Sequence, residues 1–205
     1  MIYKGVFIED FTYIANLIGV VAFAISGAIK GRKYKLDILG IVVLASMTAV
    51  GGGIIRDVLI NRIPIVLMNN QDIYVAVITA IIVHQFLKKI KINEKMFMAG
   101  ILIMDAIGLS IFTIIGAKIA INASVSVVTT AIFATITGVG GGVIRDILVS
   151  EIPIILKEDV YAFLCFVGAC IYYFMPRTIA SDIIIFMFIL LVRLIVIRYK
   201  LNLPK

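Results

Sequence analysis

Seven long apolar segments alternate with short charged clusters along this chain of 205 residues. A helix needs about 20 apolar residues to cross ~30 Å of hydrocarbon, and the segments have lengths close to that number. The pattern predicts an all-α membrane protein with seven transmembrane helices in a single domain, residues 1–205. The predicted helices cover residues 11–29, 38–60, 72–87, 96–116, 124–149, 160–175 and 182–199.

Composition points to the same class of protein. Hydrophobic residues make up 62% of the chain, and the mean hydropathy is +1.16. A soluble domain has about 45–50% apolar residues, so the chain is expected to be integral to a membrane. The formal net charge of +7 would suit nucleic acid, but the basic residues lie in short loops, where they set helix orientation. We therefore expect membrane lipids as partners and no nucleic acid.

The basic loop residues fall unequally on the two predicted sides of the membrane. One side has only Lys4, Arg62, Lys118 and Arg177. Because cytoplasmic loops carry the excess of lysine and arginine, we predict the amino terminus outside and the carboxy terminus in the cytoplasm. The short loops suit a prokaryotic plasma membrane. The cytoplasmic set of twelve is Lys30, Arg32, Lys33, Lys35, Lys88, Lys89, Lys91, Lys95, Lys157, Arg198, Lys200 and Lys205.

One stretch of sequence occurs twice. VGGGIIRDVLINRIPIVL at residues 50–67 returns as VGGGVIRDILVSEIPIIL at residues 139–156, with 12 of 18 positions identical, so chance alignment is excluded. The offset is 89 residues, and the repeating unit has three helices. Because three is odd, the second copy must enter the membrane from the opposite side. Such inverted repeats are typical of transport proteins, with the pathway at their interface. The repeats cover residues 11–87 and 96–175, and residues 182–199 form an extra helix.

Three consecutive glycines stand in the second and the fifth predicted helix. Each glycine costs about 1 kcal/mol of helix stability relative to alanine, so a triplet favours a kink or break. A break would free carbonyl oxygens, which together with the hydroxyls of Thr48 and Thr137 favour a cation pathway. In the alternative interpretation, the glycines only allow two helices to pack closely. The candidate pathway residues here are Gly51, Gly52, Gly53, Gly140, Gly141 and Gly142.

An arginine and an aspartate follow each triplet, as Arg56-Asp57 and Arg145-Asp146. Neighbouring side chains on a helix diverge by about 100°, so we expect that neither pair simply neutralises itself. The inverted arrangement would supply one arginine near each mouth of the pathway. These residues are candidates for a gate or a charge screen. Alternatively, the arginines reach the membrane surface and the aspartates cap a neighbouring segment.

Asp105 lies in the middle of the fourth apolar segment, and Asn16 is its counterpart in the first repeat. Ionisable residues within a membrane are costly and usually mark a pathway, so both positions are predicted to line one. His84 is the only histidine, and no group of metal-ligating residues or nucleophile-base arrangement is visible in the sequence. We expect no metal site, no cofactor and no enzymatic activity.

The two GGG-[IV]-IRD-[IV]-L motifs and the plan of three, three and one helices resemble the TRIC family, the trimeric intracellular cation channels, in its prokaryotic branch. The resemblance implies a homotrimer in which each subunit has its own potassium-permeable pore. It further implies that helices 1, 2, 4 and 5 line the pore, that helices 2 and 5 bend at the glycines, and that Thr48 and Thr137 lie beside the constriction.

Two functions therefore remain open. The first is a passive monovalent cation channel that prefers potassium to sodium. The alternative is a secondary transporter of a small solute such as glycine, whose carboxylate and ammonium groups would bind at the ends of broken helices. A shared fold does not by itself decide the transported species.

Overall fold

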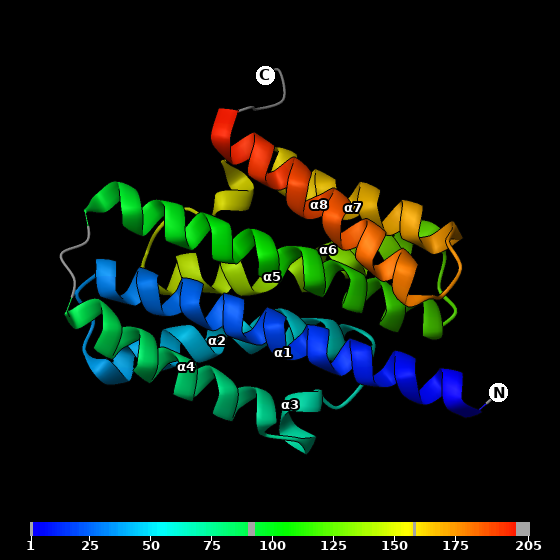
Figure 1. Cartoon of the computed structure of the whole chain (residues 1–205), viewed down its shortest axis with the longest axis horizontal. Coiled ribbons are helices and arrows are strands. Elements are labelled where there is room, and N and C mark those ends of the chain that lie inside the picture. Colours follow the sequence, from blue (N-terminus) through cyan, green and yellow to red (C-terminus); the bar gives the residue numbers. More distant parts are fainter. Residues whose placement is uncertain (1, 90–92, 158, 200–205) are drawn as a thin grey trace.

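The computed structural model describes residues 2–89, 93–157 and 159–199, and within them the chain is entirely helical and looped (Figure 1). Each predicted apolar segment lies in a helix, although Lys91, Lys200 and Lys205 of the charge count fall outside the described residues. In chain order the elements are α1 (Ile2–Lys33), α2 (Ile38–Leu59), α3 (Ile65–Met68), α4 (Gln71–Lys88), α5 (Glu94–Asn122), α6 (Val127–Leu148), η1 (Ile154–Leu156), α7 (Asp159–Phe174) and α8 (Ile179–Tyr199).

Five of the described helices are long and apolar enough to cross a membrane, namely α1 from Phe11, α2, α5, α6 and α8. The third and sixth predicted segments form the shorter helices α4, of 18 residues, and α7, of 16 residues. The largest difference in length is in α1, which extends from Ile2 to Lys33 instead of covering residues 11–29. Helix α5 also continues to Asn122 instead of ending near residue 116. The protein is thus an all-helical membrane protein.

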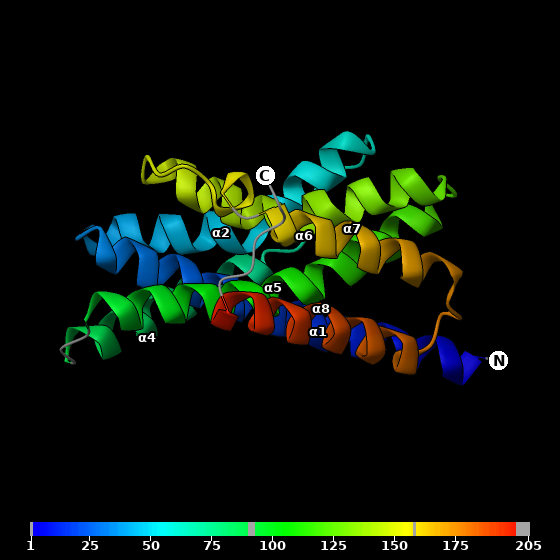
Figure 2. The same cartoon turned by 90° about the horizontal axis from the view of Figure 1, so that it is seen from above.

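The centre of the bundle has two layers. Helices α1 and α5 lie side by side and run in opposite directions, and α2 and α6 form a second layer against them (Figures 1 and 2). Glycines allow the layers to approach closely, as small residues do between membrane helices. A Cβ atom at Gly27 would lie 2.7 Å from the Cα of Ala45, and one at Gly116 would lie 2.9 Å from the Cα of Ala134. These two contacts are equivalent at an offset of 89 residues.

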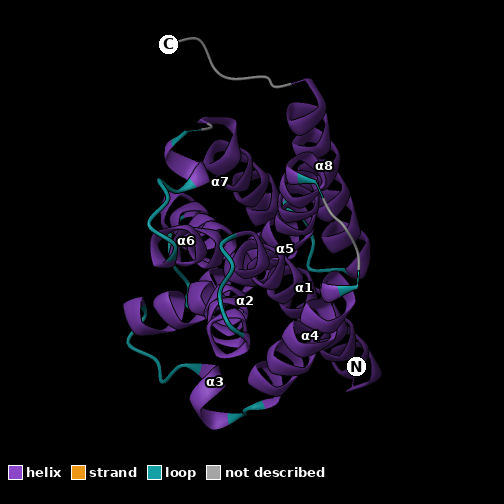
Figure 3. Ribbon diagram, turned by 90° about the vertical axis from the view of Figure 1, so that its left-hand side faces the viewer, coloured by secondary structure: helices purple, strands orange, loops and turns teal. Residues whose placement is uncertain are grey.

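The remaining helices cover this centre. Helix α4 packs against α1 and α2, α7 packs against α6, and α8 packs against α5 and α7 (Figure 3). The turns that connect the helices also repeat. Within the described residues, the non-glycine positions with positive φ are Lys35 (55°) and Asn61 (55°), and Ser124 (57°) and Ser150 (57°). Ser124 corresponds to Lys35, and Ser150 corresponds to Asn61, at the offset of 89 residues. The turns after α1 and α5, and those after α2 and α6, therefore contain a residue with the same positive φ.

The glycine triplets lie inside continuous helices. Helix α2 extends without interruption from Ile38 to Leu59, and α6 from Val127 to Leu148. A break of either helix at its triplet is therefore wrong, whereas a bend of the continuous helix stays a prediction. The cost of about 1 kcal/mol per glycine is small enough for the helical hydrogen bonds and the contacts made by the two helices to offset it.

Candidate functional site

Helices α2 and α6 cross at the second glycine of each triplet. A Cβ atom at Gly52 would lie only 2.4 Å from the carbonyl oxygen of Thr137, and one at Gly141 only 2.1 Å from that of Thr48. Not even a methyl group fits between the two backbones. The glycines therefore allow the two helices to pack closely, as the alternative interpretation holds. Thr48 and Thr137 both lie at this crossing.

The two threonine hydroxyls bond within their own helices. The Thr48 hydroxyl donates to the carbonyl of Leu44 at 2.6 Å, and the Thr137 hydroxyl donates to the carbonyl of Phe133 at 2.7 Å. Their oxygen lone pairs can still accept a bond or contact a cation. The crossing therefore brings carbonyl and hydroxyl oxygens of both helices to one level of the bundle.

Two phenylalanines lie next to the crossing. The rings of Phe23 and Phe112 are tilted by 33° and their centroids are 5.2 Å apart. A Cβ atom at Gly141 would be 3.1 Å from the Phe23 ring, and one at Gly19 would be 3.1 Å from the Phe112 ring. Neither phenylalanine is among the predicted pathway residues, although the two stand at matching positions of the repeats, 89 residues apart. That match was the signal that could have indicated a paired apolar constriction.

The neighbouring arginine and aspartate do form ion pairs. The Arg56 Nη2 atom is 2.8 Å from Asp57 Oδ1, and the Arg145 Nε atom is 2.9 Å from Asp146 Oδ1. Contrary to the expectation, the two neighbouring side chains of each pair contact each other, but Arg145 also pairs with Asp105. The long arginine side chain folds back along the helix, so the difference in Cβ direction does not separate the charged groups.

Each aspartate also holds the segment that follows its helix. The second carboxylate oxygen of Asp57 accepts a bond from the Ile65 backbone N–H at 3.0 Å. Asp146 does the same for Ile154 at 3.1 Å. These are the starts of α3 and η1, so the aspartates cap neighbouring segments while they pair with the arginines.

A cavity of about 700 Å³ surrounds Arg56 and reaches inward to Gly53 and Phe112 at the crossing. We call this side of the crossing the Arg56 end. Within the cavity, the Asn16 amide donates to Asp72 Oδ1 at 2.9 Å. The polar side chains of its lining belong to Thr12, Tyr13, Asn16, Arg56, Asp57, Arg62, Asp72, Lys118 and Asn122.

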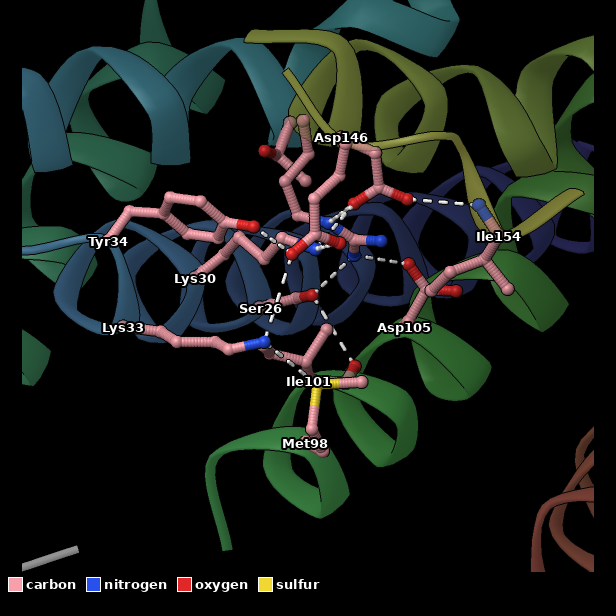
Figure 4. Close-up of polar contacts among 12 residues, drawn as sticks. Ser26, Lys30, Lys33, Tyr34, Met98, Ile101, Asp105, Asp146 and Ile154 are labelled. Carbon is pink, nitrogen blue, oxygen red and sulfur yellow. Dashed lines mark hydrogen bonds and ion pairs between the residues drawn. The ribbon is translucent and has the colours of Figure 1, made fainter. Parts of the chain in front are cut away.

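The opposite side of the crossing, which we call the Arg145 end, is filled by side chains. Arg145 is 0% exposed, and its Nη1 atom is 2.6 Å from Asp105 Oδ1 and 2.6 Å from Ser26 Oγ. The Tyr161 hydroxyl donates to the other oxygen of Asp105 at 2.5 Å. Figure 4 shows Asp105 and Ser26 converging on this cluster from α5 and α1.

An ion-pair bridge covers the cluster. The Lys30 Nζ atom of α1 is 3.1 Å from Asp146 Oδ1 and 2.7 Å from Glu151 Oε2. The Tyr34 hydroxyl donates to the other oxygen of Glu151. Lys30 is only 1% exposed, although it lies at the end of its helix. The bridge ties α1 to the end of α6 across the Arg145 end (Figure 4).

The sequence explains why only one end has this bridge. At the offset of 89, Lys30 corresponds to Ile119 and Glu151 corresponds to Arg62. Both counterparts line the cavity at the Arg56 end. Isoleucine carries no charge, so the lysine-glutamate pair has no equivalent there. The corresponding helices of the two repeats thus surround both ends in the same way. Among the described residues, the ion-pair bridge exists only at the Arg145 end, because that end has Lys30 in place of isoleucine and Glu151 in place of arginine.

The pKa of Glu151 predicts how the bridge responds to acid. Burial alone would raise this pKa, but hydrogen bonds from Lys30 and Tyr34 and the nearby lysine charges lower it from 4.5 to about 2. The hydrogen bond to Glu151 in turn raises the pKa of Tyr34 to about 12. A carboxylate with a depressed pKa stabilises the fold above its unfolded pKa, and this contribution is lost as the pH falls through the folded value.

We therefore expect wild-type protein to melt at a higher temperature than Glu151→Gln by a constant margin above about pH 5. That margin should shrink between about pH 4.5 and about pH 2, because the glutamate becomes protonated there. Thermal unfolding of both proteins between about pH 2 and about pH 7 measures this difference in melting temperature. A margin that does not change with pH would show that the Glu151 charge contributes nothing to the bridge.

Several members of the cluster were missed in the sequence. The sequence assigns Lys30 only to the charges that set orientation, and it does not indicate Tyr161, Glu151 or Tyr34 as site residues. The available signal was the pair of changes between repeats, in which Lys30 replaces isoleucine and Glu151 replaces arginine. The structure does bring the predicted residues Asp105, Arg145 and Asp146 together.

Comparison with protein families gives a match over most of the chain. The family model described as "Glycine transporter" matches residues 13–88 and again residues 102–177. The UPF0126 inner membrane protein YadS of Escherichia coli (strain K12) is 35% identical over 198 residues, which cover 94% of each chain. The UPF0126 membrane protein YvgT of Bacillus subtilis (strain 168) is 38% identical over 158 residues, 76% of each chain.

Solved structures show the same fold. The crystal structure of a prokaryotic TRIC channel in 0.5 M KCl superposes with a TM-score of 0.88 at 36% identity, and the match covers 95% of this chain and 100% of the other. The TRIC trimeric intracellular cation channel orthologue from Rhodobacter sphaeroides superposes with a TM-score of 0.85 at 26% identity, over 93% and 99% of the two chains.

The crossed helices and the charged ends on either side of them thus define an integral membrane protein with the fold of a cation channel. These solved relatives are channels, not enzymes. The chain belongs to the TRIC family, in its prokaryotic branch.

Proposed function

We propose that this protein is a monovalent cation channel with potassium as its main permeant ion. The pore runs through each subunit between α1, α2, α5 and α6, which correspond to the first, second, fourth and fifth of the seven predicted transmembrane helices. The observation that supports this best is the cavity of about 700 Å³, which leads from the Arg56 end to the glycine crossing. The bridged cluster at the Arg145 end is the closed gate.

The crossing supplies oxygen ligands for a cation. Carbonyl oxygens of Thr48 and Thr137 lie where the second glycines leave no side chain in between. Carbonyl and hydroxyl oxygens can replace the hydration shell of an alkali ion. The pore widens when α2 and α6 bend at the triplets and the Phe23 and Phe112 rings separate. In this proposal Asn16 and Asp105 line the pathway on opposite sides of the crossing.

The remaining features follow the family. Conductance is described for TRIC cation channels at 37% identity to this chain, and the Rhodobacter sphaeroides orthologue is described as trimeric. We propose a homotrimer with one pore per subunit, with inverted repeats at residues 11–87 and 96–175 and an extra helix at residues 182–199. Because cytoplasmic loops carry the excess of basic residues, we propose that the Arg145 end faces the cytoplasm.

A carrier is the second candidate, and one observation favours it. The cavity contains Arg56 and Arg62 together with Asp57 and Asp72, which suits a zwitterion such as glycine. A carrier, however, must close each end in turn. The bridge of Lys30 has no counterpart at the Arg56 end, where Ile119 stands in the corresponding place. The channel is therefore the better supported function.

Recordings in planar lipid bilayers test the proposal. With a potassium gradient and purified protein, we expect discrete openings whose currents reverse at the potassium equilibrium potential. Proteoliposomes from the same preparation should show no saturable exchange of radiolabelled glycine. Saturable glycine exchange without unitary currents would contradict the channel proposal and support the carrier.

A further inference from the structure

Helix α8 carries a buried charge that neither the pathway nor the repeats explain. Arg193 lies in this apolar helix and is 0% exposed. Its guanidinium carbon is 4.6 Å from the centroid of the Tyr161 ring on α7. A charged side chain within a membrane is costly and is usually retained for a function. The helix belongs to neither set of three, so Arg193 has no counterpart in the first repeat.

Tyr161 connects this charge to the closed end of the pathway. The tyrosine is 1% exposed, and its hydroxyl donates to Asp105 at 2.5 Å. Asp105 in turn pairs with Arg145 at 2.6 Å. A continuous series of contacts therefore runs from α8 through α7 and α5 to the end of α6.

The corresponding tyrosine of the first repeat is placed differently at the Arg56 end. With a gap of two residues in the second copy, Asp72-Ile-Tyr74 aligns with Asp159-Val-Tyr161, so Tyr74 is the counterpart of Tyr161. Tyr74 is 62% exposed. The counterpart of Asp105 is Asn16, which bonds instead to Asp72 at 2.9 Å. The cavity lies beside Asn16 and Asp72. The tyrosine that Arg193 contacts is thus buried in the cluster, whereas its counterpart in the first repeat is exposed.

We infer that Arg193 is a positioning residue that holds Tyr161 against Asp105 and thereby keeps the Arg145 end closed. The cation lies over the electron-rich ring face and draws electron density from the ring. The phenol O–H becomes a stronger donor, and its bond to the Asp105 carboxylate is strengthened as a charge-assisted hydrogen bond. The inference rests on the proposed gate, but it does not depend on which solute passes.

The test measures how often the Arg145 end opens. A background without native thiols, Cys165→Ala with Cys170→Ala, receives Ser26→Cys as a reporter inside the closed cluster. Membrane vesicles of both orientations are treated with a small, membrane-impermeant methanethiosulfonate cation, and the modification rate from the Arg145 side is recorded. Because every variant carries the same reporter, its own effect cancels from the comparison.

In this background Arg193→Met should raise the modification rate by about tenfold, since the cation over the ring is lost. Arg193→Lys keeps the cation and should remain within about twofold of the background. The matched control is Arg198→Met, an exposed arginine five positions further along the same helix, which should leave the rate unchanged. A folded Arg193→Met with the background rate would overturn the inference.

Tyr161→Phe keeps the inference testable if Arg193→Met does not assemble. It retains the ring and removes the hydroxyl, so it should raise the modification rate by itself. An unchanged modification rate would contradict the inference that the Tyr161 hydroxyl keeps the Arg145 end closed. Bilayer currents of the unaltered protein separate the two claims, because absent currents with the expected modification rates would remove the channel function and leave the role of Arg193 standing.

Discussion

A single methyl group added at Gly141 is expected to abolish ion flux and destabilise the fold. The new Cβ atom would lie 2.1 Å from the carbonyl oxygen of Thr48. This neighbour is backbone, which cannot move aside as a flexible side chain can. Overpacking of this kind costs about 3 kcal/mol or more. Gly52→Ala should behave alike, since its Cβ atom would lie 2.4 Å from the Thr137 carbonyl oxygen.

Gly53→Ala is the matched control for stability. Its Cβ atom would have the Arg56 Nη2 atom as its nearest neighbour, at an ordinary 3.7 Å. All three substitutions gain the same helix propensity, about 1 kcal/mol, so only the available space differs. Thermal unfolding in detergent and potassium flux into liposomes measure the effects. Equal melting temperatures for Gly141→Ala and Gly53→Ala would contradict a backbone crossing at this position.

Glu151→Gln should open the Arg145 end more often. The change removes one carboxylate from Lys30 and leaves that lysine with Asp146 alone, at 3.1 Å. Glu151 is partly exposed, with 25% of its side chain accessible, so the pair contributes about 1 kcal/mol. We expect the open probability in planar bilayers to rise about fivefold, with unitary conductance unchanged.

Glu94→Gln provides the control, because Glu94 is an exposed glutamate in the first turn of α5. Its open probability should match that of the wild type. A second comparison uses Lys30→Met, which removes the other partner of the bridge. If Lys30 and Glu151 act through one bridge, adding Glu151→Gln to Lys30→Met should raise the open probability little further. Independent, additive effects would mean that Glu151 acts on the gate by another route.

The helices and their order were predictable because membrane crossing imposes a length and an apolar composition that few other structures share. The repeated motif also located the crossing of α2 and α6. Their continuity through the triplets was not predictable from propensity alone. The helix cost of Gly52 and Gly141 is visible in the sequence, whereas the compensating approach to the partner backbone exists only in the folded chain.

The charged cluster was predicted only in part. Asp105, Arg145 and Asp146 were singled out because charges are rare within apolar segments. Lys30 was assigned to the loops because it ends a helix, and its partner Glu151 is 121 residues away. Neither local pattern nor charge counting can reveal such a pair. Comparing the two copies position by position shows where they differ, but only packing shows that the two differences meet.

The crossing of α2 and α6 also limits how this sequence can change. Gly52 meets the backbone at Thr137, and Gly141 meets the backbone at Thr48, so neither helix has a side chain that a second substitution could trim. A genetic selection for suppressors of Gly141→Ala should therefore return true revertants to glycine, and no compensating replacement in α2.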